Sequence, residues 1–382
     1  MSKKNKFAAE LFPKVLFVSI LGLAAIAVRA GESCANVDIC VCDIYGGELM
    51  KSVKRGEIKK LRVVENLEAS GNSRGFWEGA RKQSPGVGYY DGILLAPLGT
   101  ANVGRDGSAR FCAPAGKKLF LQALDANGDM VFTSRAFDTP KQGGFMEFAD
   151  LSAEPVRISA KAETVAPEIE KYPDGIFGKP VSFQKTIRPI LDNHCVDCHD
   201  FECGGAAKMI LSPDRGLAFS KSYTEIIWKE GVAANVDGMK KIHPANFWGA
   251  KQSRIVWILR NGHGGCELSD GEFFALRLWI DLNAPYYDTP LSAYGKNPGG
   301  RSPLTSAEIK KLFEICKVRR PESEGENGLS ARGYPIEIIS FDRPESSEIL
   351  LNVSRGSDAY LEALDIIKKG AKRLAEKPRE DM

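Results

Sequence analysis

Residues 195–199 read Cys195-Val196-Asp197-Cys198-His199, a C-x-x-C-H pattern that occurs once in the chain. This spacing lets two thiols add to the two vinyl groups of one haem, with the histidine beneath the iron. A redox dithiol and a zinc site are the alternative interpretations of a C-x-x-C pair. Both are weaker, because the histidine is in register for haem and no second C-x-x-C supplies zinc ligands. The motif therefore predicts one covalent haem c, attached at Cys195 and Cys198, with His199 as proximal axial ligand.

The surroundings of the motif are helical. Apolar residues at helical spacing precede it, namely Phe183, Ile187 and Ile190 or Leu191. A capping-box pattern at residues 269–272 opens a later helix that carries the apolar run 276–280. This pair of helices resembles a class I cytochrome c, in which the helix leading into C-x-x-C-H packs against a late helix with a Leu-x-x-aromatic pattern. We expect a mainly α-helical, class I-like monohaem cytochrome c domain over residues 175–291.

The second axial ligand must approach the iron from the opposite face of the haem. His263 lies in the Asn-Gly-His-Gly-Gly stretch 261–265, directly ahead of the late helix. Glycine-rich backbone there can present the imidazole closely, so we expect His263 to be the distal ligand. The alternatives are His243, Met209, Met239 or an open position, whereas His194 adjoins an attachment cysteine and is not in reach of the far face. Two histidine ligands would favour electron transfer over substrate binding.

The remaining cysteines are candidate disulfide partners. They are Cys34, Cys40, Cys42, Cys112, Cys203, Cys266 and Cys316. In an oxidising compartment disulfides are the default, and an odd number leaves at least one thiol free or intermolecular. Cys203 and Cys266 each follow an expected axial histidine within four residues, which suggests a disulfide between them beside the haem. A disulfide from the Cys40–Cys42 pair to Cys112 is a second hypothesis.

Patterning divides the rest of the chain. Residues 31–152 carry strand and turn signals, among them 119–124 and 130–132 separated by a glycine-containing loop, which predicts a hairpin in an all-β, sandwich-like domain. Residues 153–174 lack apolar periodicity and are interpreted as a linker. Residues 292–382 form a C-terminal extension that ends in a charged helix at 357–376. The predicted fold class is thus α+β and multidomain, with the β domain ahead of the haem domain.

The chain of 382 residues is 43% hydrophobic and 26% charged, a globular composition that excludes a wholly disordered, collagen-like or small disulfide-scaffold protein. Residues 1–30 are typical of a secretory signal peptide, with a basic start, an apolar stretch at 15–28 and a small-residue cleavage site. That stretch spans about 21 Å as a helix, short of a hydrocarbon core of roughly 30 Å, so a retained anchor is the weaker alternative. Lipid attachment at Cys34 is not expected, because Gly31-Glu32-Ser33 precedes it.

Location and partners follow from the leader. We expect export to the periplasm or an equivalent oxidising compartment, with no membrane span in the mature chain. The leader carries most of the net positive charge, so nothing favours nucleic acid as a partner.

Residues 55–65, 106–111 and 119–125 resemble the middle domain of the hydrazine synthase alpha subunit and its relatives. Residues 187–191 and 279–286 resemble the haem domain that follows in those proteins. The resemblance implies a C-terminal haem held by two histidines, which correspond to His199 by motif and to His263 by position.

The departures from this family are specific. Its β-propeller has no counterpart, since residues 31–54 are too few to build one. Its middle domain also ends in a C-x-x-C-H that carries the haem implicated in catalysis, whereas residues 134–144 contain no cysteine or histidine. We therefore expect an electron carrier more than a stand-alone enzyme.

The expected function is that of an exported monohaem c-type cytochrome that transfers single electrons between redox partner proteins, with other haem proteins as candidate partners. One alternative is a non-catalytic subunit or docking module of a larger haem enzyme complex. Another is a haem enzyme acting on a small nitrogen compound or peroxide, which requires an open iron position.

Overall fold

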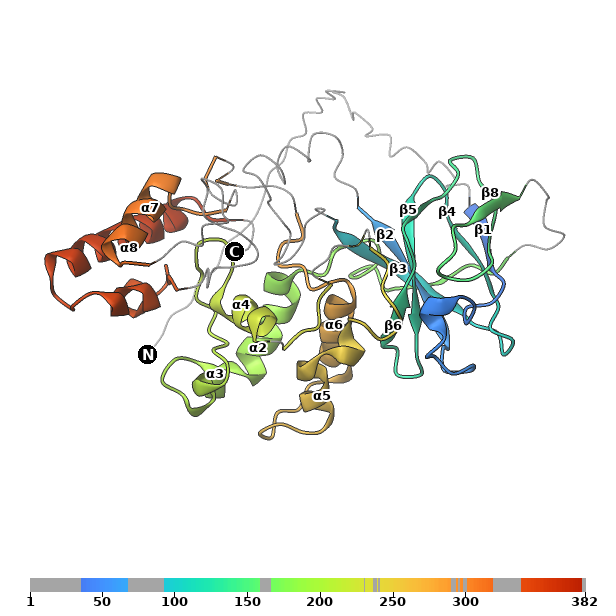
Figure 1. Ribbon diagram of the computed structural model, residues 1–382, viewed down its shortest axis with the longest axis horizontal. Helices are drawn as coiled ribbons and strands as arrows, with labels where there is room; N and C mark the ends of the chain where they lie inside the picture. Colours follow the sequence, from blue (N-terminus) through green and yellow to red (C-terminus); the bar gives the residue numbers. More distant parts are fainter. Residues whose placement is uncertain are drawn as a thin grey trace, which may run out of the picture. The chain divides into compact units, whose positions relative to one another are not determined.

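The computed structural model describes residues 36–67, 93–158, 166–229, 231–235, 239, 241–289, 293–294, 296–297, 301–318 and 338–379. The chain divides into two units, residues 1–34 and 35–382, and the first lies outside the described residues. The predicted signal peptide and Cys34 therefore fall outside what the structure describes. The second unit has β-sheets in its N-terminal part and helices after them, which confirms this order of the predicted fold class (Figure 1).

The described N-terminal strands form two sheets (Figure 1). One has the order β4-β1-β8-β9, and its pairs are antiparallel except for the parallel pair β1–β8. The other has the order β10-β3-β2-β5-β6, with β7 paired to β5. The strands are β1 (Asn36–Val41), β2 (Lys60–Asn66), β3 (Leu95–Asn102), β4 (Ala109–Pro114), β5 (Lys118–Leu124), β6 (Met130–Thr133), β7 (Phe137–Asp138), β8 (Gly144–Phe148), β9 (Val156–Ile158) and β10 (Glu170–Lys171). The last two come from the segment interpreted as a linker.

The predicted hairpin is present as the antiparallel pair β5–β6. Its loop is held by the carboxylate of Asp125, which accepts hydrogen bonds from the backbone N–H groups of Asn127 at 2.9 Å and Asp129 at 3.1 Å. Gly128 follows with φ of +76°, a conformation that glycine adopts without a steric penalty. The residues of the loop are therefore sufficient to form this turn without contacts from elsewhere in the chain.

The sheet around β2 and β5 is buried on both faces, because successive side chains of a strand point to opposite sides. Val63 and Leu121 belong to the apolar cluster that this sheet shares with the first sheet. Their neighbours Val64 and Phe120 belong to a second cluster, which they share with the helices. The β domain and the helical part therefore form two cores on the two faces of one sheet.

The helices follow in chain order. A π-helical turn, η2 (Phe183–Ile187), leads into α2 (Arg188–His194) and α3 (Val196–His199). The others are α4 (Lys221–Trp228), α5 (Arg254–Arg260), α6 (Asp270–Asp281), α7 (Ser306–Ile315) and α8 (Asp358–Glu376), with short 3-10 turns η1 (Glu48–Met50), η3 (Gly204–Ala207), η4 (Ala250–Gln252), η6 (Pro344–Ser346) and η7 (Glu348–Asn352). Among the described helices, none is both long and apolar enough to cross a membrane.

The expected packing of an early helix on a late helix is observed between η2 and α6. The ring of Phe183 lies 5.5 Å from that of Trp279 and 5.1 Å from that of Tyr223, measured between centroids. The Trp279 indole donates a hydrogen bond to the Pro285 carbonyl at 2.8 Å, which satisfies its buried N–H. The predicted capping box at Ser269 is also present and starts α6. These aromatic contacts hold the helix that leads to the C-x-x-C-H motif against α6.

A buried ion pair joins the β-sheet to α6. Arg62 on β2 is 1% exposed and Asp281 at the end of α6 is 0% exposed, with Nη1 of Arg62 3.1 Å from Oδ2 of Asp281. The carboxylate also accepts hydrogen bonds from the N–H groups of Met130 at 3.2 Å and Ala250 at 2.8 Å. Gln122 on β5 donates to the Asp281 carbonyl at 2.7 Å. Because a buried charge is tolerated only when it is paired and hydrogen-bonded, this network specifies one docking position for the sheet on α6.

Candidate haem site

Both cysteines of the motif lie on one helical turn. The N–H of Cys195 donates to Leu191 O at 2.9 Å, and the N–H of His199 donates to Cys195 O at 3.0 Å, so the chain is helical through the motif. Cys195 is half-buried and Cys198 is exposed. Burial, with a further contribution from the neighbouring Cys266, raises the pKa of the Cys195 thiol to about 12. This thiol is therefore protonated at neutral pH.

The imidazole of His199 is oriented by a backbone carbonyl. Its Nδ1 lies 2.9 Å from Met209 O. A carbonyl oxygen can only accept, so Nδ1 carries the proton and donates, which leaves Nε2 as the ring nitrogen available to a metal. Histidines that bind metals are commonly held in this way by a carbonyl behind the ring. Sequence reasoning missed this partner, because every residue has a backbone carbonyl and the residue type does not indicate which one accepts the hydrogen bond.

His263 faces His199. The two ring centroids are 5.9 Å apart and the ring planes make an angle of 31°. His263 begins a tight turn that closes when the N–H of Cys266 donates to His263 O at 2.9 Å. The two central residues, Gly264 and Gly265, have φ of +59° and +76°, which defines a turn that residues with a Cβ rarely adopt. The glycines that flank His263 thus allow the turn that directs this imidazole toward His199.

The separation of the two rings fits a single metal atom between them. A metal–imidazole bond is about 2 Å long on each side, and adding the distance from each coordinating nitrogen to its ring centre gives roughly 6 Å between the two centroids. Cys195 and Cys198 lie on the same turn as His199, as attachment to one edge of a haem requires. The residues present therefore fit a bis-histidine haem, which needs two side-chain ligands. No group of three or more metal-binding side chains gathers among the described residues.

The other ligand candidates lie elsewhere. His243 is buried and stacks on Phe247, with ring centroids 4.1 Å apart. The next residues after His243 are bonded to the β domain, since Ala245 N–H donates to Leu49 O at 2.9 Å. His194 is engaged by the α6 carboxylate Glu272, with Nε2 3.0 Å from Oε1.

The two methionines are also accounted for. Met209 accepts a hydrogen bond from the His199 imidazole through its backbone carbonyl. Met239 is 6% exposed and belongs to the helical core. Of the four candidates, His263 is the one whose side chain meets His199.

The predicted disulfides are not formed. The eight cysteines of the described residues are all free thiols: Cys40, Cys42, Cys112, Cys195, Cys198, Cys203, Cys266 and Cys316. The tight turn at residues 263–266 brings the Cys266 thiol to that of Cys195, not to Cys203. In the β1–β4 register Cys112 stands opposite Asp38, while Cys40 stands opposite Arg110, so the proposed pairing to Cys112 lacks the required alignment.

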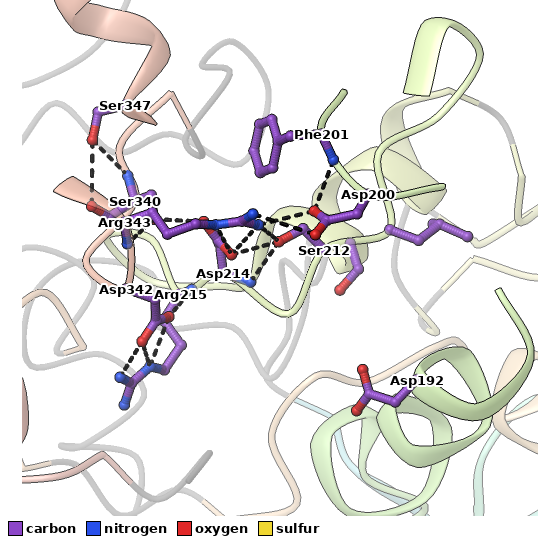
Figure 2. Close-up of polar contacts among 12 residues, drawn as sticks. Asp192, Asp200, Phe201, Ser212, Asp214, Arg215, Ser340, Asp342, Arg343 and Ser347 are labelled. Atoms are coloured by element: carbon purple, nitrogen blue, oxygen red, sulfur yellow. Dashed lines mark hydrogen bonds and ion pairs between the residues drawn. The ribbon is translucent and has the colours of Figure 1, made fainter. Parts of the chain in front are cut away.

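An arginine from the C-terminal extension also reaches this region and was missed from the sequence. Arg343 contacts Asp200, the residue after His199, with Nη2 2.9 Å from Oδ1 (Figure 2). The two residues are 143 positions apart in the chain. No short-range pattern links positions at such a distance, so only the folded structure reveals the contact.

The architecture thus combines a two-sheet β domain with a helical part that carries a C-x-x-C-H motif and a facing histidine. Residues 56–145 match the family model described as the hydrazine synthase alpha subunit middle domain. This range runs from just before β2 into β8 and confirms the predicted resemblance. Residues 56–145 therefore form a domain of the hydrazine synthase alpha family.

A solved structure, Kuenenia stuttgartiensis hydrazine synthase, is similar to the chain at 17% sequence identity with a TM-score of 0.44. The alignment covers 67% of this chain and 44% of that chain, so this chain spans less than half of the length of the solved one. No curated protein sequence matched.

Proposed function

We propose that this protein is an exported monohaem c-type cytochrome that passes single electrons between redox partner proteins. The observation that carries the proposal is the pair of facing imidazoles, His199 and His263, whose centroids are 5.9 Å apart beside the C-x-x-C-H turn. The helical part is then a class I-like cytochrome c domain. Its haem c would be attached through Cys195 and Cys198, with His199 proximal and His263 distal.

The bound haem would supply a one-electron Fe(III)/Fe(II) couple. The chain's own residues determine how that couple is used. His199 donates from Nδ1 to Met209 O at 2.9 Å, which holds its ring in one orientation. With His263 on the other face, both axial positions of the haem would be filled, and no position would be left for a substrate. This arrangement supports electron transfer more than catalysis on a small molecule.

A role within a larger assembly is supported by the β domain. Its match is to a domain of the hydrazine synthase alpha subunit. In this chain residues 134–144 contain no second haem motif. The buried Arg62–Asp281 pair fixes the β domain against α6, so a partner that binds the β domain would also place the haem domain. A non-catalytic, electron-delivering subunit of a haem enzyme complex is therefore the form of the proposal that uses both domains.

The first prediction is one covalent haem per chain. The full chain, exported by a host with the c-type maturation machinery, should show by mass spectrometry the mass of one added haem and a cleaved leader. The double variant Cys195→Ala, Cys198→Ala should add none, because both thioether bonds are lost. Cys203→Ala is the matched control, a half-buried cysteine four residues after His199, and should keep the haem. Two haems, or none on the wild type, would contradict the proposal.

Binding of added ligands distinguishes the electron carrier from the alternative, a haem enzyme with an open iron position. If both axial sites are filled, cyanide, nitric oxide or hydroxylamine should leave the absorption spectrum of the oxidised protein unchanged. A rapid spectral shift on adding these ligands would favour the enzyme instead. A stable co-purifying haem protein would favour the subunit role.

A further inference from the structure

The C-terminal extension supplies a guanidinium that bridges the two ends of the loop after the C-x-x-C-H motif (Figure 2). We call residues 200–214 the proximal loop. Arg343 donates from Nη2 to Asp200 Oδ1 at 2.9 Å at the start of this loop. It also donates to Ser212 Oγ at 2.6 Å and to Asp214 Oδ1 at 2.6 Å at the end. The guanidinium carbon lies 4.6 Å from the ring centroid of Phe201, which adds a cation–π contact.

The proximal loop is what holds the His199 imidazole. Met209 O accepts from His199 Nδ1 at 2.9 Å, and the Leu211 N–H donates to His199 O at 2.7 Å. The loop also packs directly on the ring. A Cβ added at Gly205 would lie 2.4 Å from Cys198 O and 2.9 Å from His199 Nδ1, so only glycine fits there. Any widening of the loop would therefore loosen the carbonyl contact that orients His199.

Arg343 is itself fixed in place. Its backbone N–H donates to Ser340 Oγ at 2.8 Å, and that hydroxyl donates to Asp214 Oδ2 at 2.6 Å. The residues beside Asp214 and Arg343 are also joined, since the Arg215 N–H donates to Asp342 Oδ2 at 2.7 Å. Asp214 is 4% exposed. The guanidinium of an arginine can bind a buried carboxylate through two hydrogen bonds at once. The ammonium group of a lysine cannot reproduce this geometry.

We propose that Arg343 is a positioning residue for the proximal haem ligand: by joining both ends of the proximal loop, it holds the Met209 carbonyl against His199 and so keeps the imidazole basic and oriented. The inference rests on the proposed function, since it requires a haem on His199. It also gives the C-terminal extension a role, because the extension completes the site from a distant part of the chain. A carbonyl behind the ring raises the basicity of a histidine ligand and stabilises Fe(III), which lowers the reduction potential.

The test compares three forms of the full-length haem protein: wild type, Arg343→Lys and the control Arg215→Lys. Both substitutions keep the positive charge and replace the planar guanidinium, which can make two parallel hydrogen bonds, with a single ammonium group. Arg215 pairs with Asp342, the residue before Arg343, but this ion pair does not join the two ends of the proximal loop. Haem content is measured first by mass spectrometry. The reduction potential and hydrogen exchange of peptides covering residues 200–214 are then measured, with peptides from β2 and β5 as the reference for an intact fold.

Arg343→Lys should raise the reduction potential and speed exchange in the proximal loop by about tenfold to a hundredfold, the range for losing one charge-assisted hydrogen bond. Arg215→Lys should shift the potential and the exchange of this loop much less. Faster exchange with an unchanged potential would overturn the proposal, since Arg343 would then be structural only. Unchanged exchange and potential would overturn it as well. Absence of haem from the wild type would reject the proposed function itself, and this result is seen before any variant is compared.

Discussion

At the scale of single residues, the proposed haem chemistry depends on two imidazoles and on what surrounds them. His199 is half-buried and is held by the Met209 carbonyl, whereas His263 is exposed and is held by its turn. The two proposed ligands therefore differ in how firmly they are fixed. The distal side is the one that a single substitution should open without disturbing the fold, because exposed positions cost little stability.

We predict that His263→Ala converts a low-spin bis-histidine spectrum into a high-spin one that binds cyanide or nitric oxide, because one axial position becomes free. His263→Met should keep the low-spin state and raise the reduction potential. Optical and paramagnetic resonance spectra of the oxidised protein measure both effects. His243→Ala is the control, since His243 stacks on Phe247 away from His199. A low-spin signal that survives His263→Ala and is lost in His243→Ala would transfer the ligand role to His243.

At the scale of elements, one carboxylate joins α7 to α8. Glu308 closes the capping box of α7 with Thr305, and it also accepts from Arg373 of α8 at 2.7 Å on each oxygen. The hydrogen bond from Arg373 is the main cause that lowers the pKa of Glu308 to about 2. A folded-state pKa below the unfolded value means that this carboxylate stabilises the fold above the unfolded pKa, and that the contribution is lost as the pH falls.

We predict that Glu308→Gln lowers the free energy of unfolding by about 1 kcal/mol near neutral pH, a value that allows for the partial exposure of the pair. The difference from wild type should shrink as the pH falls below about 4.5 toward the folded-state pKa of about 2, and it should vanish below that pKa, where the carboxylate is protonated in both states. Urea unfolding across this pH range measures it. The control is Glu362→Gln, which removes an exposed α7–α8 ion pair with Lys311 and should have a smaller effect. A pH-independent difference would contradict the assignment.

At the scale of the whole described unit, the β domain and the helical part share one sheet and one buried ion pair. Burial raises the pKa of Asp281, while Arg62 and the backbone donors oppose this effect. Asp129 adds ion pairs to Arg260 at 2.5 Å and Arg277 at 2.8 Å. Because Arg62, Asp281 and Asp129 are buried where the two parts meet, we expect the two parts to unfold together.

We predict that Arg62→Met destabilises the chain by about 3–5 kcal/mol, because it leaves the Asp281 carboxylate buried without its cation. Chemical unfolding should show haem absorbance and β-sheet circular dichroism changing in one transition in the wild type. Lys60→Met, also on β2, removes only the exposed pair with Glu170 and should cost less than about 1 kcal/mol. Two separate transitions in the wild type would show that the interface couples the domains weakly.

Features that depend on residues a few positions apart were correctly predicted from the sequence. The β5–β6 hairpin follows from an Asp and a Gly within one loop, and the start of α6 follows from the Ser269–Glu272 capping box. The terminal helix was expected at 357–376 and is observed as α8, which begins after its cap at Ser357. In each case the interactions that form the element join residues close together in the sequence, so the sequence pattern is enough to predict the element.

The sequence by itself determined the C-x-x-C-H spacing on one helical turn and the glycines that allow the His263 turn. Only the tertiary structure decided that the imidazole of His263, and not that of His243, meets His199, that Cys266 meets Cys195 instead of Cys203, and that Arg343 joins the ends of the proximal loop. The physical reason is separation along the chain. Contacts such as Arg62–Asp281, 219 positions apart, form because buried charge and apolar surface must find partners in the packed molecule, and no local propensity encodes which partner that is.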